Sequence, residues 1–416
     1  MSNVTIRDVR AIATHPGTVN LVAVKVETSE PGLYGVGCAT FTQRSEAVVT
    51  AINTYIKPLC VGKSVDNIED MWQFLMGSSY WRNGPVLNNA ISGVDEALWD
   101  IKGKMANMPV YQLLGGKCRE GAPVYRHCDG ASPEEVAENV QKYMEEGYRH
   151  VRVQQGVYGG NMNGSQEDMF DKIGKSAATG FHSPEGAPNG AYFDPKEYMR
   201  RTLKLFDYLR SKLGFEIELM HDVHERLSPI DGVSFAREVE QYKLFFLEDL
   251  FSPEQSQWFR QVRNVCATPI AMGELFNNPL EWRDLVADQM IDFIRIHVSQ
   301  IGGISAAKKV ANFCEPFGIR TAWHGPNDIT PIGVAAHLAV DLSVSNFGIQ
   351  EFAGFTEAEK EVFPGCPEVR NGFLYANEKP GLGIDIDEAA AARYPARYHD
   401  NGWLWARLPD GTAVRA

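Results

Sequence analysis

The feature that most constrains the fold of this chain is an alternation of strand-like and helix-like segments that begins near residue 122. Eight short apolar segments have the composition of buried strands, and most stretches between them have the apolar spacing of helices. These strand segments are 123–127, 150–154, 216–222, 245–249, 269–274, 293–297, 321–324 and 348–351. Because eight parallel strands that alternate with helices over roughly 250 residues are typical of a (β/α)8 barrel, the pattern predicts an α/β barrel.

The region before the predicted barrel has a different order of elements. Two β-rich runs lie within 4–28 and a short strand follows at 35–41, whereas the apolar residues of 45–60 and 86–106 have helical spacing. Strands that precede helices in this way are typical of an α+β unit.

The sequence therefore divides into three parts. We expect an α+β capping domain at 1–122, a barrel domain at 123–380 and a C-terminal segment at 381–416 that packs back on the body of the protein. One barrel loop, 156–195, is long and crowded with Gly, Asn, Ser and Pro. A long loop inside a compact domain is usually a lid or a binding loop, so this segment is predicted to be a lid that contacts the ligand.

Composition excludes several classes of partner. With 40 Lys and Arg against 53 Asp and Glu, the net charge is −13, which argues against nucleic acid or an anionic membrane surface as the main partner. No apolar run approaches the length of a membrane span, and no stretch reads as a signal peptide. The seven cysteines form no Cys-x-x-Cys pair, so they predict reduced thiols in a cytoplasmic protein and neither a disulfide framework nor a zinc knuckle.

Polar residues recur at or near the ends of the predicted barrel strands. One residue from each strand gives the series His127, Arg152, Asp222, Glu248, Glu274, His297, His324 and Glu351. All but one of the intervals between them lie between 23 and 27 residues, close to the length of one βα unit. Because the carboxyl ends of barrel strands converge on one face, we expect these side chains to crowd one cavity.

Three successive members of this series are carboxylates: Asp222, Glu248 and Glu274. Converging carboxylates repel each other and raise one another's pKa unless a cation lies among them. Oxygen ligands suit a hard ion, and Mg²⁺ typically takes few protein carboxylates and keeps positions for water and substrate. The series therefore predicts a Mg²⁺ site; the alternative, for each acid taken alone, is an ordinary ion-paired residue beside a helix start.

Four further residues, in or beside this series, have more than one possible role. His224 follows Asp222 by two residues, and in an extended chain that spacing places both side chains on the same side. A histidine there can protonate a leaving group, or it can merely orient Asp222. His324 can be a base, an acid or a hydroxyl-binding group, and Glu351 can bind a hydroxyl or hold a histidine. Arg295 is either structural or in contact with the substrate.

Longer motifs in the chain resemble the enolase superfamily. They are the carboxylate series, the run Glu-Ala-Leu-Trp-Asp-Ile-Lys-Gly at 96–103 and the run Ser-Gln-Ile-Gly-Gly-Ile at 299–304. Three further motifs resemble the mannonate dehydratase subgroup, which also contains galactonate-dehydratase-like and starvation-sensing proteins. They are His-Asp-Val-His at 221–224, Gly-Glu-Leu-Phe at 273–276 and Trp-His-Gly-Pro-Asn-Asp at 323–328. The similarity extends over essentially the whole chain.

The resemblance implies a set of site residues. Mg²⁺ would be bound by Asp222, Glu248 and Glu274, with His224 as the general acid. The implied substrate contacts come from Gln43, His127, Arg295, His324, Asp328 and Glu351. In the active dehydratases the base is a Tyr held by an Arg on the second barrel strand, and the matching residues here are Tyr158 and Arg152.

Two positions depart from the pattern of the active dehydratases. Tyr158 follows Arg152 by only six residues, whereas the Tyr of those enzymes lies further into the loop. His297 stands where many superfamily members carry an Asp partner for the histidine of the next strand. Because a displaced base can remove most of the rate while leaving the fold and the metal untouched, we predict weak or no activity on D-mannonate.

The function predicted from the sequence is that of a Mg²⁺-dependent acid-sugar dehydratase. Tyr158 would take the C2 proton of an aldonate-type carboxylate, and His224 would protonate the departing 3-hydroxyl to give a 2-keto-3-deoxy acid. The alternatives are a catalytically silent acid-sugar-binding protein and a racemase or epimerase on the same scaffold. The tail aromatics Trp403 and Trp405 also predict a homo-oligomer.

Overall fold

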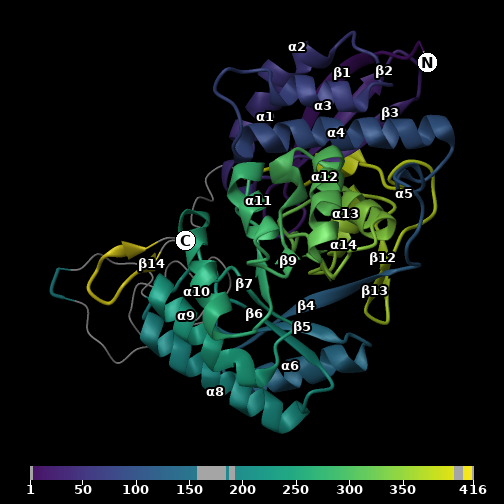
Figure 1. Ribbon diagram of the computed structural model, residues 1–416. Coiled ribbons are helices and arrows are strands. Elements are labelled where there is room, and N and C mark those ends of the chain that lie inside the picture. The colour runs from purple at the N-terminus through teal and green to yellow at the C-terminus, as the bar shows by residue number, and fades with distance from the viewer. Residues whose placement is uncertain (1–2, 157–183, 187–192, 398–405, 415–416) are drawn as a thin grey trace. The chain divides into compact units, whose positions relative to one another are not determined.

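The computed structural model describes residues 3–156, 184–186, 193–397 and 406–414 (Figure 1). The chain forms two compact units, each built from separate stretches of sequence. The first unit comprises 1–124, 273–287 and 294–400, and the second comprises 125–272, 288–293 and 401–416. The N-terminal region therefore shares its unit with most of the last third of the chain.

Three antiparallel strands begin the first unit: β1 (Ile6–Thr14), β2 (Leu21–Thr28) and β3 (Tyr34–Cys38). The long helix α4 (Pro85–Ala106) packs against this sheet (Figure 1). The contact is close at β3, where a Cβ built on Gly37 would lie 2.2 Å from a backbone carbonyl oxygen of α4. Any larger residue at this position would push the helix away from the sheet.

Further short helices belong to this part of the first unit, and all of them except α5 contribute to one apolar core with α4. They are α1 (Ser45–Thr50), the π-helical turn η2 (Ala51–Ile56), α2 (Lys57–Cys60), α3 (Ile68–Met76) and α5 (Val110–Leu113). The core consists of buried Val and Ile side chains of β1 and β2 against Ile, Leu and Met of the helices. In the described part of the chain, no helix is long and apolar enough to span a bilayer.

Parallel strands alternate with helices from β4 onward. The elements in chain order are β4 (Ala122–Gly130), α6 (Pro133–Glu145), β5 (His150–Gln155), α8 (Pro195–Leu213), β6 (Glu218–Asp222), α9 (Pro229–Glu238), β7 (Phe246–Glu248), α10 (Phe259–Val265) and β8 (Ile270–Met272). In the second unit, β4 to β8 pair in sequential order as a parallel sheet. The register pairs Asp222 with Glu248, so two carboxylates lie on neighbouring strands at their carboxyl ends.

Later strands are very short. They are β9 (Phe293–Ile294), β10 (Arg320–Thr321) and β11 (Gln350–Glu351), so each of the eight predicted barrel segments overlaps a strand. The helices of this region are α11 (Pro279–Ala287), α12 (Ile304–Cys314), α13 (Pro331–Ser343), α14 (Glu357–Val362) and α15 (Glu388–Ala391). Two hairpins were not predicted: β12 (Glu368–Arg370) with β13 (Phe373–Tyr375), and β14 (Ala406–Arg407) with β15 (Ala413–Val414).

An ion-pair cluster joins α15 to the N-terminal sheet. Glu388 accepts from Nη1 and Nη2 of Arg10 at 2.5 and 2.6 Å and from Nζ of Lys25 at 2.8 Å. The hydrogen bonds from Arg10 are the main reason why the pKa of Glu388 is lowered to about 2. A carboxylate with a lowered pKa stabilises the folded state above its ordinary pKa, and this contribution is lost as the pH falls toward the folded value.

Glu388→Gln is therefore expected to reduce the free energy of unfolding by about 1 kcal/mol at pH 7, since the pair is partly exposed and screened. The difference from the wild type should shrink as the pH falls from 4.5 toward 2. Urea denaturation between pH 7 and pH 3 measures it. Glu357→Gln is the matched control. Glu357 is an exposed acid, and its one described ion pair is with Lys360. Equal stability of the two variants at pH 7 would contradict the prediction.

Candidate metal and acid–base site

Three buried carboxylates lie together where β6 and β7 end. Asp222 is the last residue of β6, Glu248 is the last residue of β7, and Asp249 follows it. Each is at most 1% exposed, and one ligand oxygen from each lies within 4.8 Å of the others. The structure thus brings together two of the predicted residues and adds Asp249, which the sequence analysis missed. Its position directly after a strand-end acid was the signal that could have identified it. We call Asp222, Glu248 and Asp249 the carboxylate cluster.

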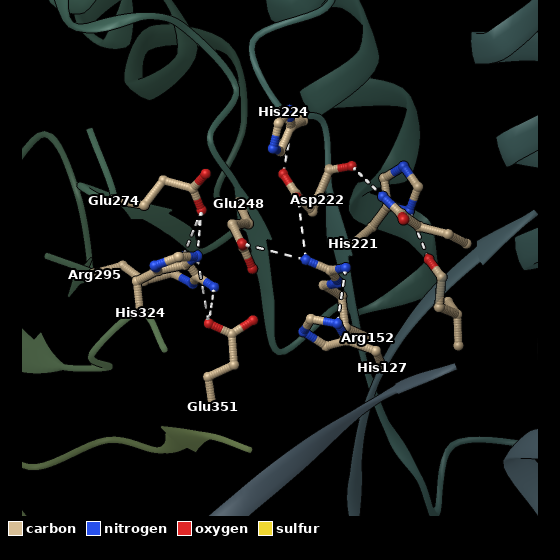
Figure 2. A network of polar contacts seen from close by, with 12 residues as sticks. His127, Arg152, His221, Asp222, His224, Glu248, Glu274, Arg295, His324 and Glu351 are labelled. Carbon is tan, nitrogen blue, oxygen red and sulfur yellow. Dashed lines mark hydrogen bonds and ion pairs between the residues drawn. The ribbon is translucent and has the colours of Figure 1, made fainter. Parts of the chain in front are cut away.

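Arg152 of β5 is a positive group beside the carboxylate cluster (Figure 2). Its Nη1 donates to Asp222 Oδ2 at 3.0 Å and lies 3.8 Å from Glu248 Oε1. Its Nη2 is 3.2 Å from Nδ1 of His127, which must accept because a guanidinium can only donate. His127 lies inside β4, not at its end as the sequence suggested, and it is the register partner of Arg152.

The composition of the carboxylate cluster fits a hard divalent cation. Three carboxylates lie within 4.8 Å of one another among buried groups, and buried charges are paired or coordinate metals. The ligand atoms are all oxygens, which is the donor type that Mg²⁺ prefers. The residues present therefore fit a magnesium ion.

The chain turns immediately after β6, and this changes the placement of His224. His224 has φ 53° and Glu225 has φ 57°, so both residues are left-handed and the extended conformation assumed from the sequence is wrong. The His224 backbone N–H instead donates to Asp222 Oδ1 at 2.7 Å. His224 is thus tied to the carboxylate through its backbone, and its ring lies beside Asp222 (Figure 2).

A second histidine supports the same strand end. His221 Nδ1 donates to the carbonyl oxygen of Val153 at 2.8 Å, so its Nε2 accepts from the hydroxyl of Tyr198 at 2.6 Å. Burial lowers the pKa of His221 to about 4, which keeps the ring neutral. Gln154 also donates to the Asp222 carbonyl oxygen at 2.9 Å. These contacts hold the end of β6 in place, and the sequence analysis did not predict them.

In the first unit, four other predicted residues form what we call the Glu274 cluster: Glu274, Arg295, His324 and Glu351 (Figure 2). Arg295 donates through Nη1 to Glu274 Oε2 at 2.8 Å and through Nη2 to Glu351 Oε2 at 2.5 Å. Nε2 of His324 lies 3.5 Å from Glu274 Oε2. Arg295 is fully buried, so its charge holds the two carboxylates in fixed positions.

A pair of histidines adjoins the Glu274 cluster. Nδ1 of His297 lies 2.7 Å from Nδ1 of His324, so one ring donates and the other accepts. Burial lowers the pKa of His297 to about 4, which makes it a neutral partner. Asp328 has a ligand atom within 4.8 Å of ligand atoms of both histidines. Burial, followed by the charge of Glu351, raises the pKa of Asp328 to about 8, so its carboxyl can donate a hydrogen bond near neutral pH.

The remaining two predicted site residues are Gln43 and Tyr158. Gln43 is exposed in the short helix η1 (Thr42–Arg44), where its carbonyl oxygen accepts from Arg44 Nη1 at 2.6 Å. Tyr158, like most of the predicted lid 156–195, lies outside the described residues.

Comparison with known proteins matches both parts of the chain. Residues 2–115 match the mandelate racemase / muconate lactonizing enzyme N-terminal domain, and residues 135–390 match the enolase C-terminal domain-like family. The chain is 58% identical over 415 residues to a D-galactonate dehydratase family member from Enterocloster bolteae. It is 53% identical over 416 residues to another from Pantoea ananatis, and both comparisons cover 100% of each chain.

Solved structures agree with these matches. The crystal structure of an enolase from Pantoea ananatis with bound D-gluconate and Mg has a TM-score of 0.95 at 52% identity and covers 100% of both chains. That of a putative dehydratase from Zymomonas mobilis has a TM-score of 0.79 at 26% identity and covers 94% of this chain and 98% of the other. These matches confirm the predicted fold class, an N-terminal α+β domain followed by an α/β barrel.

Proposed function

Because the chain belongs to the enolase superfamily and, within it, to the D-galactonate dehydratase family, we propose that it is a Mg²⁺-dependent lyase that removes water from an acid sugar. The observation that carries the proposal is the register pairing of the buried acids Asp222 and Glu248, with Arg152 within ion-pair distance of both. A buried site of carboxylates and one guanidinium can hold a hard cation and attract a carboxylate substrate.

Mg²⁺ is the cofactor, and the similar enolase from Pantoea ananatis was solved with Mg and D-gluconate bound. Asp222, Glu248 and Glu274 would hold the ion, and Asp249 lies in the same carboxylate cluster as the first two. When bound, the ion stabilises the negative charge that develops on the substrate carboxylate as the C2 proton leaves.

The proton transfers fall to residues of the chain itself. The fixed charge of Arg152, buried beside Asp222, favours a substrate carboxylate and lowers the pKa of a phenol placed next to it. Tyr158 is the base that the resemblance to the dehydratases implies. His224 is the proposed acid, because its backbone is fixed by Asp222 and its imidazolium can protonate the departing 3-hydroxyl.

We assign the substrate to the aldonate class, with a 2-keto-3-deoxy acid as product. The D-gluconate bound to the similar enolase supports this class. The motifs at 221–224, 273–276 and 323–328 support a place in the mannonate dehydratase subgroup. The proposed contacts to the sugar come from Gln43, His127, Arg295, His324, Asp328 and Glu351. Of these, Asp328 can donate to a hydroxyl, since its pKa is raised to about 8 by burial and then by Glu351.

A panel of acid sugars tests the proposal. Purified protein with Mg²⁺ is expected to form a 2-keto-3-deoxy acid from at least one C6 aldonate, with D-gluconate and D-galactonate in the panel. On D-mannonate we expect turnover below about 1 s⁻¹, the lower end of the usual range for enzymes. The reason is the short interval between Arg152 and Tyr158, which alters the reach of the base. Faster turnover on D-mannonate would show that the short interval is harmless.

The same assay separates the rival functions. Tight binding of an aldonate without any keto acid would favour a catalytically silent binding protein. Exchange or inversion at C2 without keto acid would favour a racemase or epimerase. A homo-oligomer, a cytoplasmic location and the domain boundaries remain predictions.

A further inference from the structure

The amide of Asn88 joins α4 to two other segments of the first unit. Asn88 is fully buried, and its Nδ2 lies 2.7 Å from the carbonyl oxygen of Gln300 and 3.0 Å from that of Asn277. The same nitrogen lies 2.9 Å from Oδ1 of Asn83. Backbone carbonyls only accept, so the nitrogen and not the oxygen of this amide must face them. In the described part of the chain, Oδ1 of Asn88 has no hydrogen-bond partner, so the amide is placed for its donor side alone.

The two carbonyls belong to turns that follow Glu274, a proposed Mg²⁺ ligand, and His297, the ring partner of His324. Asn277 comes three residues after Glu274, in the turn between β8 and α11. Gln300 comes three residues after His297, in the short helix η5 (Val298–Ile301). One buried side chain of α4 thus ties both turns to a rigid helix.

Side chains of α3 and α4 also bond the segment that follows His297. Trp72 of α3 donates through Nε1 to the carbonyl oxygen of Gly302 at 2.9 Å. Asp95 of α4 accepts from the backbone N–H of Ser305 at 2.9 Å and from its hydroxyl at 2.5 Å. These contacts reach only the turn after His297. Asn88 differs from them because it also bonds the turn after Glu274.

We propose that Asn88 is a positioning residue for the metal site, acting through the turn that follows Glu274. This inference rests on the proposed role of Glu274 as a Mg²⁺ ligand. The Glu274 side chain is oriented by Arg295, whereas the turn three residues further along the chain is bonded by Asn88 at the Asn277 carbonyl oxygen. Loss of the amide would let the turn shift, and a ligand oxygen that moves by a fraction of an ångström binds Mg²⁺ less well, since the ion demands near-ideal geometry.

Asn89 provides a matched control. It is the next residue of α4 and is equally buried, but its Nδ2 donates at 2.7 Å to the carbonyl oxygen of Pro85 within the same helix. Removing either amide deletes one buried donor from α4. Only the loss of the Asn88 amide releases the two turns, so a purely structural effect would be similar in Asn88→Ala and Asn89→Ala.

The test compares Mg²⁺ affinity, measured by titration calorimetry, with the urea midpoint in Asn88→Ala, Asn89→Ala and Glu274→Gln. We expect the Mg²⁺ dissociation constant of Asn88→Ala to rise about 10-fold, the lower end of the usual effect of residues that support metal ligands. Asn89→Ala should keep the wild-type constant with a similar loss of urea resistance. In Asn88→Ala, excess Mg²⁺ should restore most of the turnover, which an unfolding defect would not allow.

One result would overturn the inference about Asn88, and a different result would overturn its premise that Glu274 binds Mg²⁺. If Glu274→Gln loses Mg²⁺ affinity but Asn88→Ala binds as Asn89→Ala does, Asn88 has no positioning role. If Glu274→Gln itself binds Mg²⁺ normally, the proposed ligand set is wrong. Should Asn88→Ala fail to fold, Asn88→Ser carries the same expectation, because its short hydroxyl cannot span the two carbonyls.

Discussion

Glu274→Gln is expected to raise the dissociation constant for Mg²⁺ at least about 100-fold, beyond the usual effect of residues that only support a ligand, and to abolish detectable turnover. The amide keeps the shape of the side chain but removes a negative charge, and a neutral oxygen is a weak partner for a hard dication. Arg295 also loses its ion pair with Glu274.

Titration calorimetry on the purified protein measures this effect. Glu96→Gln is the matched control, because Glu96 is a fully buried acid of α4 that belongs to neither cluster. Burial raises the pKa of Glu96 to about 8, so the residue is already mostly neutral at pH 7 and the amide imitates it. We expect this control to bind Mg²⁺ like the wild type. If Glu274→Gln does so as well, Glu274 does not belong to the ligand set.

His224→Asn is expected to lower kcat by about 10²- to 10⁴-fold, the usual contribution of a general acid, with unchanged affinity for Mg²⁺. Asparagine accepts the left-handed backbone that His224 adopts at φ 53°, and it keeps the N–H that donates to Asp222. It cannot protonate a leaving hydroxyl. Exchange of the C2 hydrogen should persist, because the proposed base is untouched.

The measurement is steady-state keto-acid formation together with C2 deuterium exchange in D₂O. Lys243→Asn is the matched control, since it replaces an exposed residue at φ 50° in the same unit. It is expected to keep the wild-type kcat. A His224→Asn variant that loses Mg²⁺ affinity would instead indicate that the histidine only orients Asp222, and unchanged kcat would exclude it as the acid.

The strand series could be read from the sequence because barrel strands are short, apolar and regularly spaced. Strand lengths could not be read, since hydrogen bonding sets where a strand ends and leaves no mark on composition. The predicted segment 321–324, for example, contains only the end of β10 (Arg320–Thr321). The hairpin of β12 and β13 was missed because its three-residue strands are too short to give a period-two signal.

Within the candidate site, the sequence could predict which side chains lie together where their positions along the strands decide it. Asp222 and Glu248 lie 26 residues apart, one βα unit, and they are register partners in the sheet. The left-handed turn at His224 and the bonds of Asn88 were hidden, because they depend on a local turn and on contacts between distant segments. The role of Tyr158 stays a prediction.

The register of β6 and β7 has a consequence for how proteins of this kind diversify. Because Asp222 and Glu248 are backbone partners, their separation is set by the roughly 4.8 Å spacing of hydrogen-bonded strands and not by the loops that follow them. Loops can therefore be lengthened, shortened or exchanged without realigning the two acids. Selection on loops can therefore alter what the site accepts while the two acids stay aligned. A mutagenesis library that spares 218–222 and 246–248 begins with this pair of carboxylates intact in every member.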